Sequence, residues 1–378
     1  CACLVGSEMC IRDRLYDADG NEYLDFLAGI AVNSLGHAHP ALVKAISEQA
    51  AKLMHCSNIY YTDIQAKAVK EIIEATGFDR VFLANSGAEA NEGAIKLARK
   101  YGHQKNEGKY RIITAVHSFH GRTMMTVTAT GQPKYQQGYE PLPAGFDYVP
   151  YGDLEALREA MDEDVCCVLL EPIQGEGGVH VPSNTYLHEA RLLCDKYDAL
   201  LVFDEIQTGV ARTGKWFAYM HSGVKPDIMT FAKGIGGGFP VGGFVVTERL
   251  AHVFKPGDHG GTFGGNALAC AAIYATLTTI KNENIVEQTA EKGAYFKKKL
   301  EFLMAKYSDK VIEIRGCGLI LGMELNKDGK EVVEACLKRQ VIVNCTAGNV
   351  IRLVPPLIVT KEEIDQAVAA LDAALAEF

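Results

Sequence analysis

Residues 81–90 read Val-Phe-Leu-Ala-Asn-Ser-Gly-Ala-Glu-Ala, a short apolar run followed by the start of a strongly periodic segment. Small and apolar residues then recur at helical spacing, at Ala90, Ala94, Leu97, Ala98 and Tyr101. This stripe predicts a helix with one buried face. Ser86 with Glu89 three residues later forms a capping-box pattern, so we expect Ser86 to be the N-cap. A buried strand followed by a capped helix is the unit from which α/β folds are built.

Similar apolar runs recur along the middle of the chain, at residues 111–116, 165–170, 199–203 and 228–232. Several are apolar on consecutive residues, which is typical of a mainly parallel sheet covered on both faces. A helical pattern at 184–197 places Leu187, Ala190, Cys194 and Tyr197 on one face. We therefore predict a large α/β domain over residues 40–282.

The pattern changes near residue 283, where a long amphipathic helix precedes short strands at 311–315, 319–325 and 351–354 and a helix from about Lys361. We predict a smaller α+β domain over residues 283–378. Strand-like residues 14–16 and 22–26 place the segment 1–39 with this smaller domain. The chain begins with Cys1 rather than Met, and we expect its natural start to lie upstream.

Composition excludes several classes of protein. Lys and Arg number 38 against 47 Asp and Glu, a net charge of −9, and no basic block argues for nucleic acid or an anionic membrane. The longest uncharged stretch, residues 260–280, is rich in Gly, Thr and Asn, which excludes a transmembrane helix. The eleven cysteines form no C-x-x-C pair. We expect a reduced, cytoplasmic protein without a metal site, in which His37 and His39 flank a turn before Pro40.

Three segments carry the chemistry. The predicted helix start at Ser86, Gly87 and Ala88 leaves N–H groups free for a phosphate, although a merely well-capped helix fits it too. Asp204 and Glu205 follow an apolar strand, at the edge where α/β proteins bind ligands. Lys233 follows another strand and precedes a run of small residues.

Taken singly, Asp204 fits an ordinary ion pair and Lys233 a solvated loop charge. Together, a lysine that forms an imine, an aspartate that keeps a pyridine nitrogen protonated and a phosphate site match pyridoxal 5'-phosphate. No G-x-x-x-x-G-K-[ST] occurs, and no glycine cluster gives G-x-G-x-x-G between a strand and a helix. A Rossmann dehydrogenase is thus a weak alternative.

Several further motifs occur in a recognisable order: LYDADGNEYLDFLAGIAVNSLGHAHP (15–40), FLANSGAEANEGAIKLARK (82–100), SFHGRTM (118–124), EPIQGEGGV (171–179), FDEIQTGVARTG (203–214), FAKGIGGGFPVG (231–242), GGTFGGNALA (260–269) and IRLVPPL (351–357). With them the chain resembles the class III pyridoxal-phosphate-dependent aminotransferases of fold type I. The resemblance implies a large cofactor-binding domain with a mixed, mainly parallel sheet, and a small α+β domain formed by the C-terminal part and the N-terminal segment.

The resemblance also implies roles for single residues. Lys233 would hold the cofactor and move the substrate proton, and Asp204 would pair with the ring nitrogen. Thr262 would reach the phosphate from a partner subunit, which implies a homodimer with shared active sites. We expect the other cofactor contacts from the helix start, from a covering aromatic ring and from the residues after Asp204: Ser86, Gly87, Ala88, Phe119, Glu205, Ile206 and Gln207.

Substrate binding would rest on two arginines, because guanidinium groups pair bidentately with carboxylates. The family pattern implies that Arg352 takes the α-carboxylate of glutamate and Arg122 faces its far end. Glu176 would pair with an arginine when the substrate tail is uncharged. Gly261 stands where related enzymes usually have Ser, so we expect one substrate hydrogen bond fewer.

Within the family, the compact loop after Lys233 is most similar to enzymes that transaminate N-acetylornithine with 2-oxoglutarate in arginine biosynthesis. Ornithine, succinylornithine and 4-aminobutyrate are the nearest alternative donors. An aminomutase or decarboxylase is disfavoured by Arg122, and a non-catalytic nucleotide-binding protein by the missing motifs.

Overall fold

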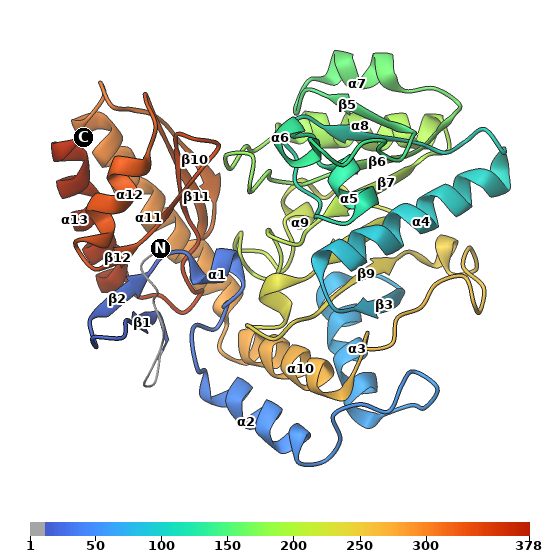
Figure 1. The fold of residues 1–378 in the computed structure, drawn as a ribbon, viewed down its shortest axis with the longest axis horizontal. Helices are drawn as coiled ribbons and strands as arrows, with labels where there is room; N and C mark the ends of the chain where they lie inside the picture. The colour runs from blue at the N-terminus through green and yellow to red at the C-terminus, as the bar shows by residue number, and fades with distance from the viewer. Residues whose placement is uncertain (1–11) are drawn as a thin grey trace.

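A computed structural model describes residues 12–378, so Cys1, Cys3 and Cys10 lie outside the described residues. Its larger body is built on a seven-stranded sheet of order β3-β9-β8-β7-β6-β4-β5 (Figure 1). The strands are β3 (Arg80–Ala84), β4 (Arg111–Ala115), β5 (Phe146–Val149), β6 (Val165–Leu170), β7 (Leu200–Asp204), β8 (Ile228–Phe231) and β9 (Gly242–Val246). Only β9 runs antiparallel to its neighbours. The expected mixed, mainly parallel sheet is confirmed.

Helices cover both faces of this sheet, because alternate side chains of each strand point to opposite faces. Leu200 and Val202 of β7 pack in the cluster that contains α4 (Gly87–Lys105), whereas Leu201 and Phe203 pack in the cluster that contains α8 (Asn184–Lys196). Shorter helices complete these layers: α5 (Met124–Ala129), α6 (Pro133–Gln136), α7 (Leu154–Ala160) and α9 (Tyr219–Ser222).

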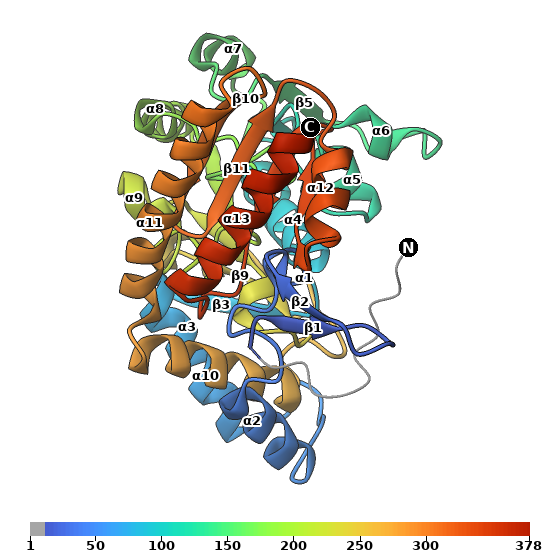
Figure 2. The same ribbon diagram turned by 90° about the vertical axis from the view of Figure 1, so that its left-hand side faces the viewer.

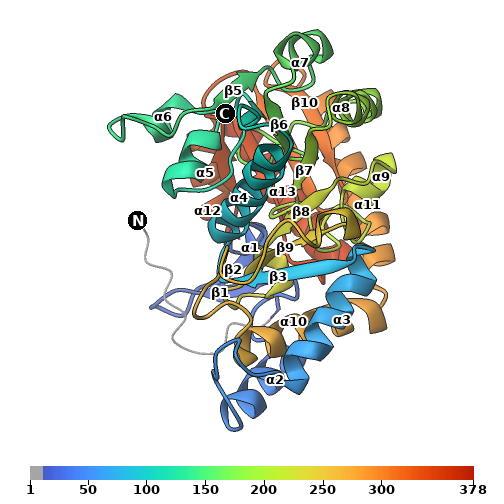
Figure 3. The same ribbon diagram turned by 90° about the vertical axis from the view of Figure 1, so that its right-hand side faces the viewer.

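Three helices lie beyond the β3 edge of the sheet (Figure 3). They are α2 (Pro40–Ala50), α3 (Asp63–Thr76) and α10 (Ala267–Asn282). α10 contacts both α2 and α3, and α3 contacts β3. Among the described residues, no helix has the length and apolar character needed to cross a membrane.

The smaller body joins the two ends of the described chain. Its antiparallel sheet has the order β10-β11-β14-β13, and helices α11 (Ile285–Lys306) and α13 (Lys361–Glu377) lie over it (Figure 2). A second sheet pairs β2 (Glu22–Asp25) in parallel with β12 (Val341–Ile342), and so attaches the N-terminal segment. The remaining elements are β1 (Arg14–Tyr16), α1 (Ala28–Ala31), β10 (Val311–Cys317), β11 (Ile320–Leu325), α12 (Lys330–Leu337), β13 (Asn344–Thr346) and β14 (Val350–Leu353).

Candidate active site

A cavity of about 450 Å³ opens where the parallel strands β7 and β8 end and helix α4 begins. This is the edge of an open α/β sheet at which ligands bind. Most of the predicted cofactor residues line it: Ser86, Gly87, Ala88, Phe119, Asp204, Ile206, Gln207 and Lys233. Arg122 and Glu171 also line it. The structure therefore brings together residues that lie far apart in the sequence.

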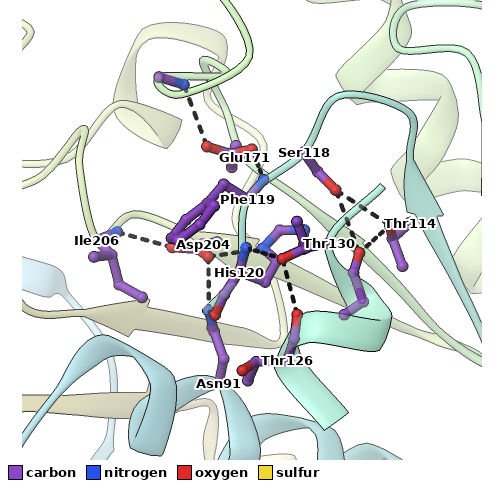
Figure 4. Close-up of polar contacts among 12 residues, drawn as sticks. Asn91, Thr114, Ser118, Phe119, His120, Thr126, Thr130, Glu171, Asp204 and Ile206 are labelled. Atoms are coloured by element: carbon purple, nitrogen blue, oxygen red, sulfur yellow. Dashed lines mark hydrogen bonds and ion pairs between the residues drawn. The ribbon is translucent and has the colours of Figure 1, made fainter. Parts of the chain in front are cut away.

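Asp204 is the most firmly held charged group of the cavity. Its Oδ2 accepts hydrogen bonds of 2.8 Å from both Asn91 Nδ2 and His120 Nδ1, and its Oδ1 accepts one of 3.0 Å from the Ile206 N–H (Figure 4). Asn91, His120 and Asp204 are all buried. Three donors from three segments thus fix the orientation of this carboxylate.

Lys233 directly follows Ala232 at the end of β8, and its φ of 45° turns the chain sharply there. Burial, and to a smaller extent the nearby guanidinium of Arg352, lowers the pKa of Lys233 from 10.5 to about 8. A neutral amine is therefore present in useful amounts near neutral pH. Such an amine can act as a nucleophile or as a base.

The start of α4 forms the phosphate end of the cavity. Ser86 is the N-cap as predicted, and its Oγ accepts a hydrogen bond of 3.2 Å from the Glu89 N–H. The carboxylate of Glu89 accepts from the Asn85 N–H at 2.7 Å, one residue before the partner that a capping box would use. A Cβ on Gly87 would lie 2.8 Å from Ile206 Cδ1, so a larger residue here would displace the Ile206 side chain. First-turn N–H groups beside an open cavity suit an anion.

Arg352 lies just behind the cavity wall, on β14 of the smaller body. Its side chain is fully buried, and its Nη1 donates to Glu176 Oε2 at 2.9 Å and to Gln207 Oε1 at 3.1 Å. Its Nη2 is buried and has no hydrogen-bond partner among the described residues. An unpaired guanidinium donor beside Gln207, which lines the cavity, suits a carboxylate ligand.

Arg122 lines the cavity and is exposed to solvent. Its guanidinium lies 4.2 Å from the ring centroid of Tyr135 and 5.6 Å from that of Phe119. Cation–π contacts of this kind hold the group in place without neutralising its charge. Arg122 is therefore a cation held ready for an anionic ligand.

Five predicted residues do not line the cavity of this chain. Arg352 contacts the wall residue Gln207, and Glu176 pairs with Arg352, whereas Glu205, Gly261 and Thr262 lie elsewhere. Glu205 points away, and its carboxylate accepts from the Ala218 N–H at 2.9 Å, the Tyr219 N–H at 2.7 Å and the Thr208 hydroxyl at 2.5 Å. Glu205 therefore does not line the cavity, and its carboxylate holds the backbone of residues 218–219. Gly261 and Thr262 are exposed, and Gly261 lines a different cavity together with Tyr61 and His259.

Sequence reasoning missed Asn91, His120 and Glu171. Asn91 could have been recognised as a polar residue next to the apolar stripe of α4. His120 could have been recognised because it lies between the predicted site residues Phe119 and Arg122. Glu171 is buried, and its carboxylate accepts from the Phe119 N–H at 3.0 Å and the Gly175 N–H at 3.2 Å. Burial raises the pKa of Glu171 to about 7. It joins the loop of Phe119 and Arg122 to the loop of Glu176.

The cavity meets the needs of one kind of cofactor. A partly neutral lysine suits an aldehyde, a fixed aspartate suits a protonated ring nitrogen, and the N-terminus of α4 suits a phosphate. Gly87 and Ala88 line the cavity without a large side chain of their own at this helix start. Fold and site together define the class of enzymes that use pyridoxal phosphate.

Comparisons with known proteins agree. The family model of the class-III aminotransferases matches residues 12–375, so the chain belongs to this family. The acetylornithine aminotransferase of Caldanaerobacter subterraneus is 55% identical over 96% of this chain and 93% of that protein. The ornithine aminotransferase structure from Toxoplasma gondii, described with partial occupancy of PLP at its active site, has a TM-score of 0.94 at 36% identity over 98% and 90% of the two chains. The acetylornithine aminotransferase structure from Elizabethkingia anophelis has a TM-score of 0.88, also at 36% identity, over 98% and 94%.

Membership of this family makes the chain a transaminase and implies pyridoxal phosphate as its cofactor. The resemblance stated from the motifs, the fold class and the enzyme class are thereby confirmed.

Proposed function

We propose that this chain transfers the terminal amino group of N-acetylornithine to 2-oxoglutarate, which yields N-acetylglutamate 5-semialdehyde and glutamate. The ion pair of Arg352 with Glu176, 2.9 Å long and next to Gln207, is the observation that carries this proposal. The names of relatives such as the Caldanaerobacter enzyme support it.

The chemistry of the two donors explains why such a pair is useful. Glutamate carries a carboxylate on the carbon that loses its amine, whereas the reacting terminal carbon of N-acetylornithine carries none. Arg352 must therefore be free for the first substrate and neutralised for the second. Glu176 can do this because its side chain is 28% exposed and can turn away, while Arg352 is fully buried.

Both donors also have a carboxylate at the end remote from the reacting carbon. Arg122 lies on the cavity wall without an ion pair to any of residues 12–378, so we assign this carboxylate to it. Its exposed side chain can adjust to the one-bond difference in reach between the two substrates. Bidentate pairing would then fix the substrate chain across the cavity.

When bound, pyridoxal phosphate supplies the electron sink that makes the substrate proton acidic. Ser86, Gly87 and Ala88 would hold its phosphate, and Phe119 and Ile206 would enclose its ring. The Asp204 carboxylate, oriented by Asn91 and His120, would pair with the protonated ring nitrogen. The Lys233 amine would take the proton from the reacting carbon of the substrate and deliver it to the former aldehyde carbon of the cofactor, as a base whose pKa is lowered to about 8 can near neutral pH.

We also propose that a second copy of the chain completes the phosphate site with Thr262. This residue is exposed and lies outside the cavity of its own chain. Ile59 is 79% exposed, Tyr60 69% and Phe263 60%, and an apolar surface of this kind marks a protein interface. The cysteines of the described residues are all unpaired, which supports a reducing compartment such as the cytoplasm.

The test is a panel of donors assayed with 2-oxoglutarate: N-acetylornithine, succinylornithine, ornithine and 4-aminobutyrate. We expect N-acetylornithine to give the highest kcat/KM. A higher value for ornithine or 4-aminobutyrate would assign the chain to another branch of the family. Light scattering of the purified protein tests the dimer, and loss of cofactor affinity in Thr262→Ala tests the shared site.

A further inference from the structure

Arg212 is a buried cation to which neither the family motifs nor the proposed mechanism gives a task. Its side chain is among the largest fully buried ones, at 1% exposure. Its Nη1 donates to two backbone carbonyls, those of Leu319 at 3.0 Å and Pro355 at 2.5 Å. Burial alone lowers the pKa of Arg212 to about 9. Burying a guanidinium that has only carbonyl groups as partners costs free energy of desolvation, so we expect its position to serve a purpose.

Both carbonyls belong to the smaller body, whereas Arg212 belongs to the larger one. Leu319 lies in the turn between β10 and β11, and Pro355 lies three residues after Arg352 of β14. The Leu319 N–H also donates to the Arg212 carbonyl at 2.9 Å. Arg212 therefore ties two segments of the smaller body to the loop that follows β7.

The same loop carries Gln207, whose Oε1 accepts from Arg352 Nη1 at 3.1 Å. Residues 207–212 thus contact β14 and its extension at both ends, Gln207 at Arg352 and Arg212 at Pro355. Two hydrogen bonds therefore join residues 207–212 to residues 352–355, one at each end of the two segments. The position of Arg352 relative to the cavity wall depends on both bonds.

Glycines allow close backbone contacts where the loop after β7 meets α11 and the turn between β10 and β11. A Cβ on Gly318 would lie 2.6 Å from the Arg212 carbonyl oxygen, and one on Gly293 would lie 2.4 Å from Gly318. A Cβ on Gly214 would lie 2.8 Å from Ala290 of α11. Backbones in such contact cannot slide past one another without clashes. A shift at Arg212 would therefore be passed on to β14.

We propose that Arg212 is a positioning residue for Arg352, and that it sets the affinity for the dicarboxylate substrate by fixing β14 against residues 207–212. This inference rests on the proposed function in one respect, the use of Arg352 for the carboxylate next to the reacting carbon. Arg212 touches neither the cavity nor the reacting atoms. It acts through the chain that carries Arg352.

The experiment compares Arg212→Met, which removes the donors, with Arg212→Lys, which keeps a cation. The matched control is Lys109→Met, because Lys109 is also buried and its Nζ donates to two carbonyls, Glu163 at 3.0 Å and Tyr197 at 2.8 Å, away from the cavity. The readouts are thermal melting, KM and kcat for each substrate, and calorimetric binding of glutarate, a dicarboxylate without an amine.

We expect Arg212→Met to raise KM for 2-oxoglutarate and to weaken glutarate binding by about ten- to a hundredfold, as a misplacement of about 1 Å does. KM for N-acetylornithine and kcat of its half-reaction should change much less. Arg212→Lys should recover part of the loss. Lys109→Met should lower the melting temperature without moving the KM for 2-oxoglutarate.

Unchanged glutarate binding and KM in folded Arg212→Met would overturn the inference, and so would an equal shift in Lys109→Met. If Arg212→Met does not fold, Arg212→Lys decides: a raised KM for 2-oxoglutarate supports the role and an unchanged one refutes it. Arg352→Lys separates this inference from the proposed function. If that variant binds glutarate like the wild type, the assignment of Arg352 itself is wrong.

Discussion

Replacing Glu176 by Gln should change which donor the enzyme prefers, because it leaves Arg352 without its only charged partner among residues 12–378. With N-acetylornithine bound, the guanidinium would then face an apolar substrate carbon without a counter-charge. With glutamate bound, the substrate carboxylate would pair with Arg352 and would no longer compete with Glu176. The substitution should therefore impair the first half-reaction and spare or favour the second.

The burial of the pair sets the size of this effect. Removing one member of a buried, hydrogen-bonded charge pair costs about 2–5 kcal/mol. The Arg352 side chain has no exposed surface but that of Glu176 is 28% exposed, so water screens one end of the pair. We therefore take the lower part of the range, about 2–3 kcal/mol. At about 1.4 kcal/mol per factor of ten, the ratio of the two half-reactions should move by about 30- to 150-fold.

Single-turnover absorbance changes of the bound cofactor, recorded with each donor separately, measure that ratio directly. Glu324→Gln is the matched control, because Glu324 pairs with Arg315 at similar side-chain exposures, 26% and 8%, outside the cavity. It should leave the ratio unchanged. Equal losses with both donors in Glu176→Gln would show that the residue only supports the loop, and the masking argument would be refuted.

Three further predictions concern the strand ends. The rate at which the cofactor-free enzyme condenses with added pyridoxal phosphate should rise with pH through about 8, because only the neutral Lys233 amine attacks the aldehyde, and borohydride should then fix the cofactor to Lys233. Lys233→Ala should lose several orders of magnitude of turnover; labelling of another lysine in the peptide map would contradict this. Asp204→Asn should lower kcat by at least about a hundredfold because the fixed charge is lost, while the melting temperature changes little; near-normal turnover would exclude this role. Glu205→Ala should lower the free energy of unfolding by about 2–4 kcal/mol, because it leaves two N–H groups and a hydroxyl without an acceptor, yet should not weaken cofactor binding; urea denaturation and a cofactor titration test both statements.

The central strands could be predicted from sequence because parallel strands covered on both faces are apolar at consecutive positions. The strands β5 and β9 were missed. β9 begins with Gly242 and Gly243, which hide a strand pattern. The structure explains both glycines: a Cβ on Gly242 would lie 2.3 Å from the Ser86 carbonyl oxygen, and one on Gly243 would lie 2.5 Å from that of Phe82. Both contacts arise because β3 lies beside β9 in the sheet. The local sequence of β9 does not contain this information.

The adjacent carboxylates Asp204 and Glu205 show the same limit at the site. Successive residues of an extended strand point to opposite faces, so only one of them could face the cavity. Sequence alone does not say which, because both types of residue bind cations and backbone donors. The choice is made by what lies on each face: Asn91 and His120 on one, and the N–H groups of Ala218 and Tyr219 on the other. Each set of donors comes from a distant segment, so the chemistry of the strand end is decided by tertiary packing.

Arg212 and Arg352 extend this argument to cations. Both are buried, and both follow or interrupt apolar residues. Arg352 has a carboxylate partner that can leave, whereas a buried Nη2 without a hydrogen-bond partner among the described residues is common to both arginines. Arg212 has backbone carbonyls as partners, which cannot leave without moving the chain. A cation paired with a movable side chain can exchange that partner for a substrate carboxylate, whereas a cation paired with the backbone can only hold segments together. The nature of the partner, and not burial or charge, therefore separates the binding arginine from the positioning one.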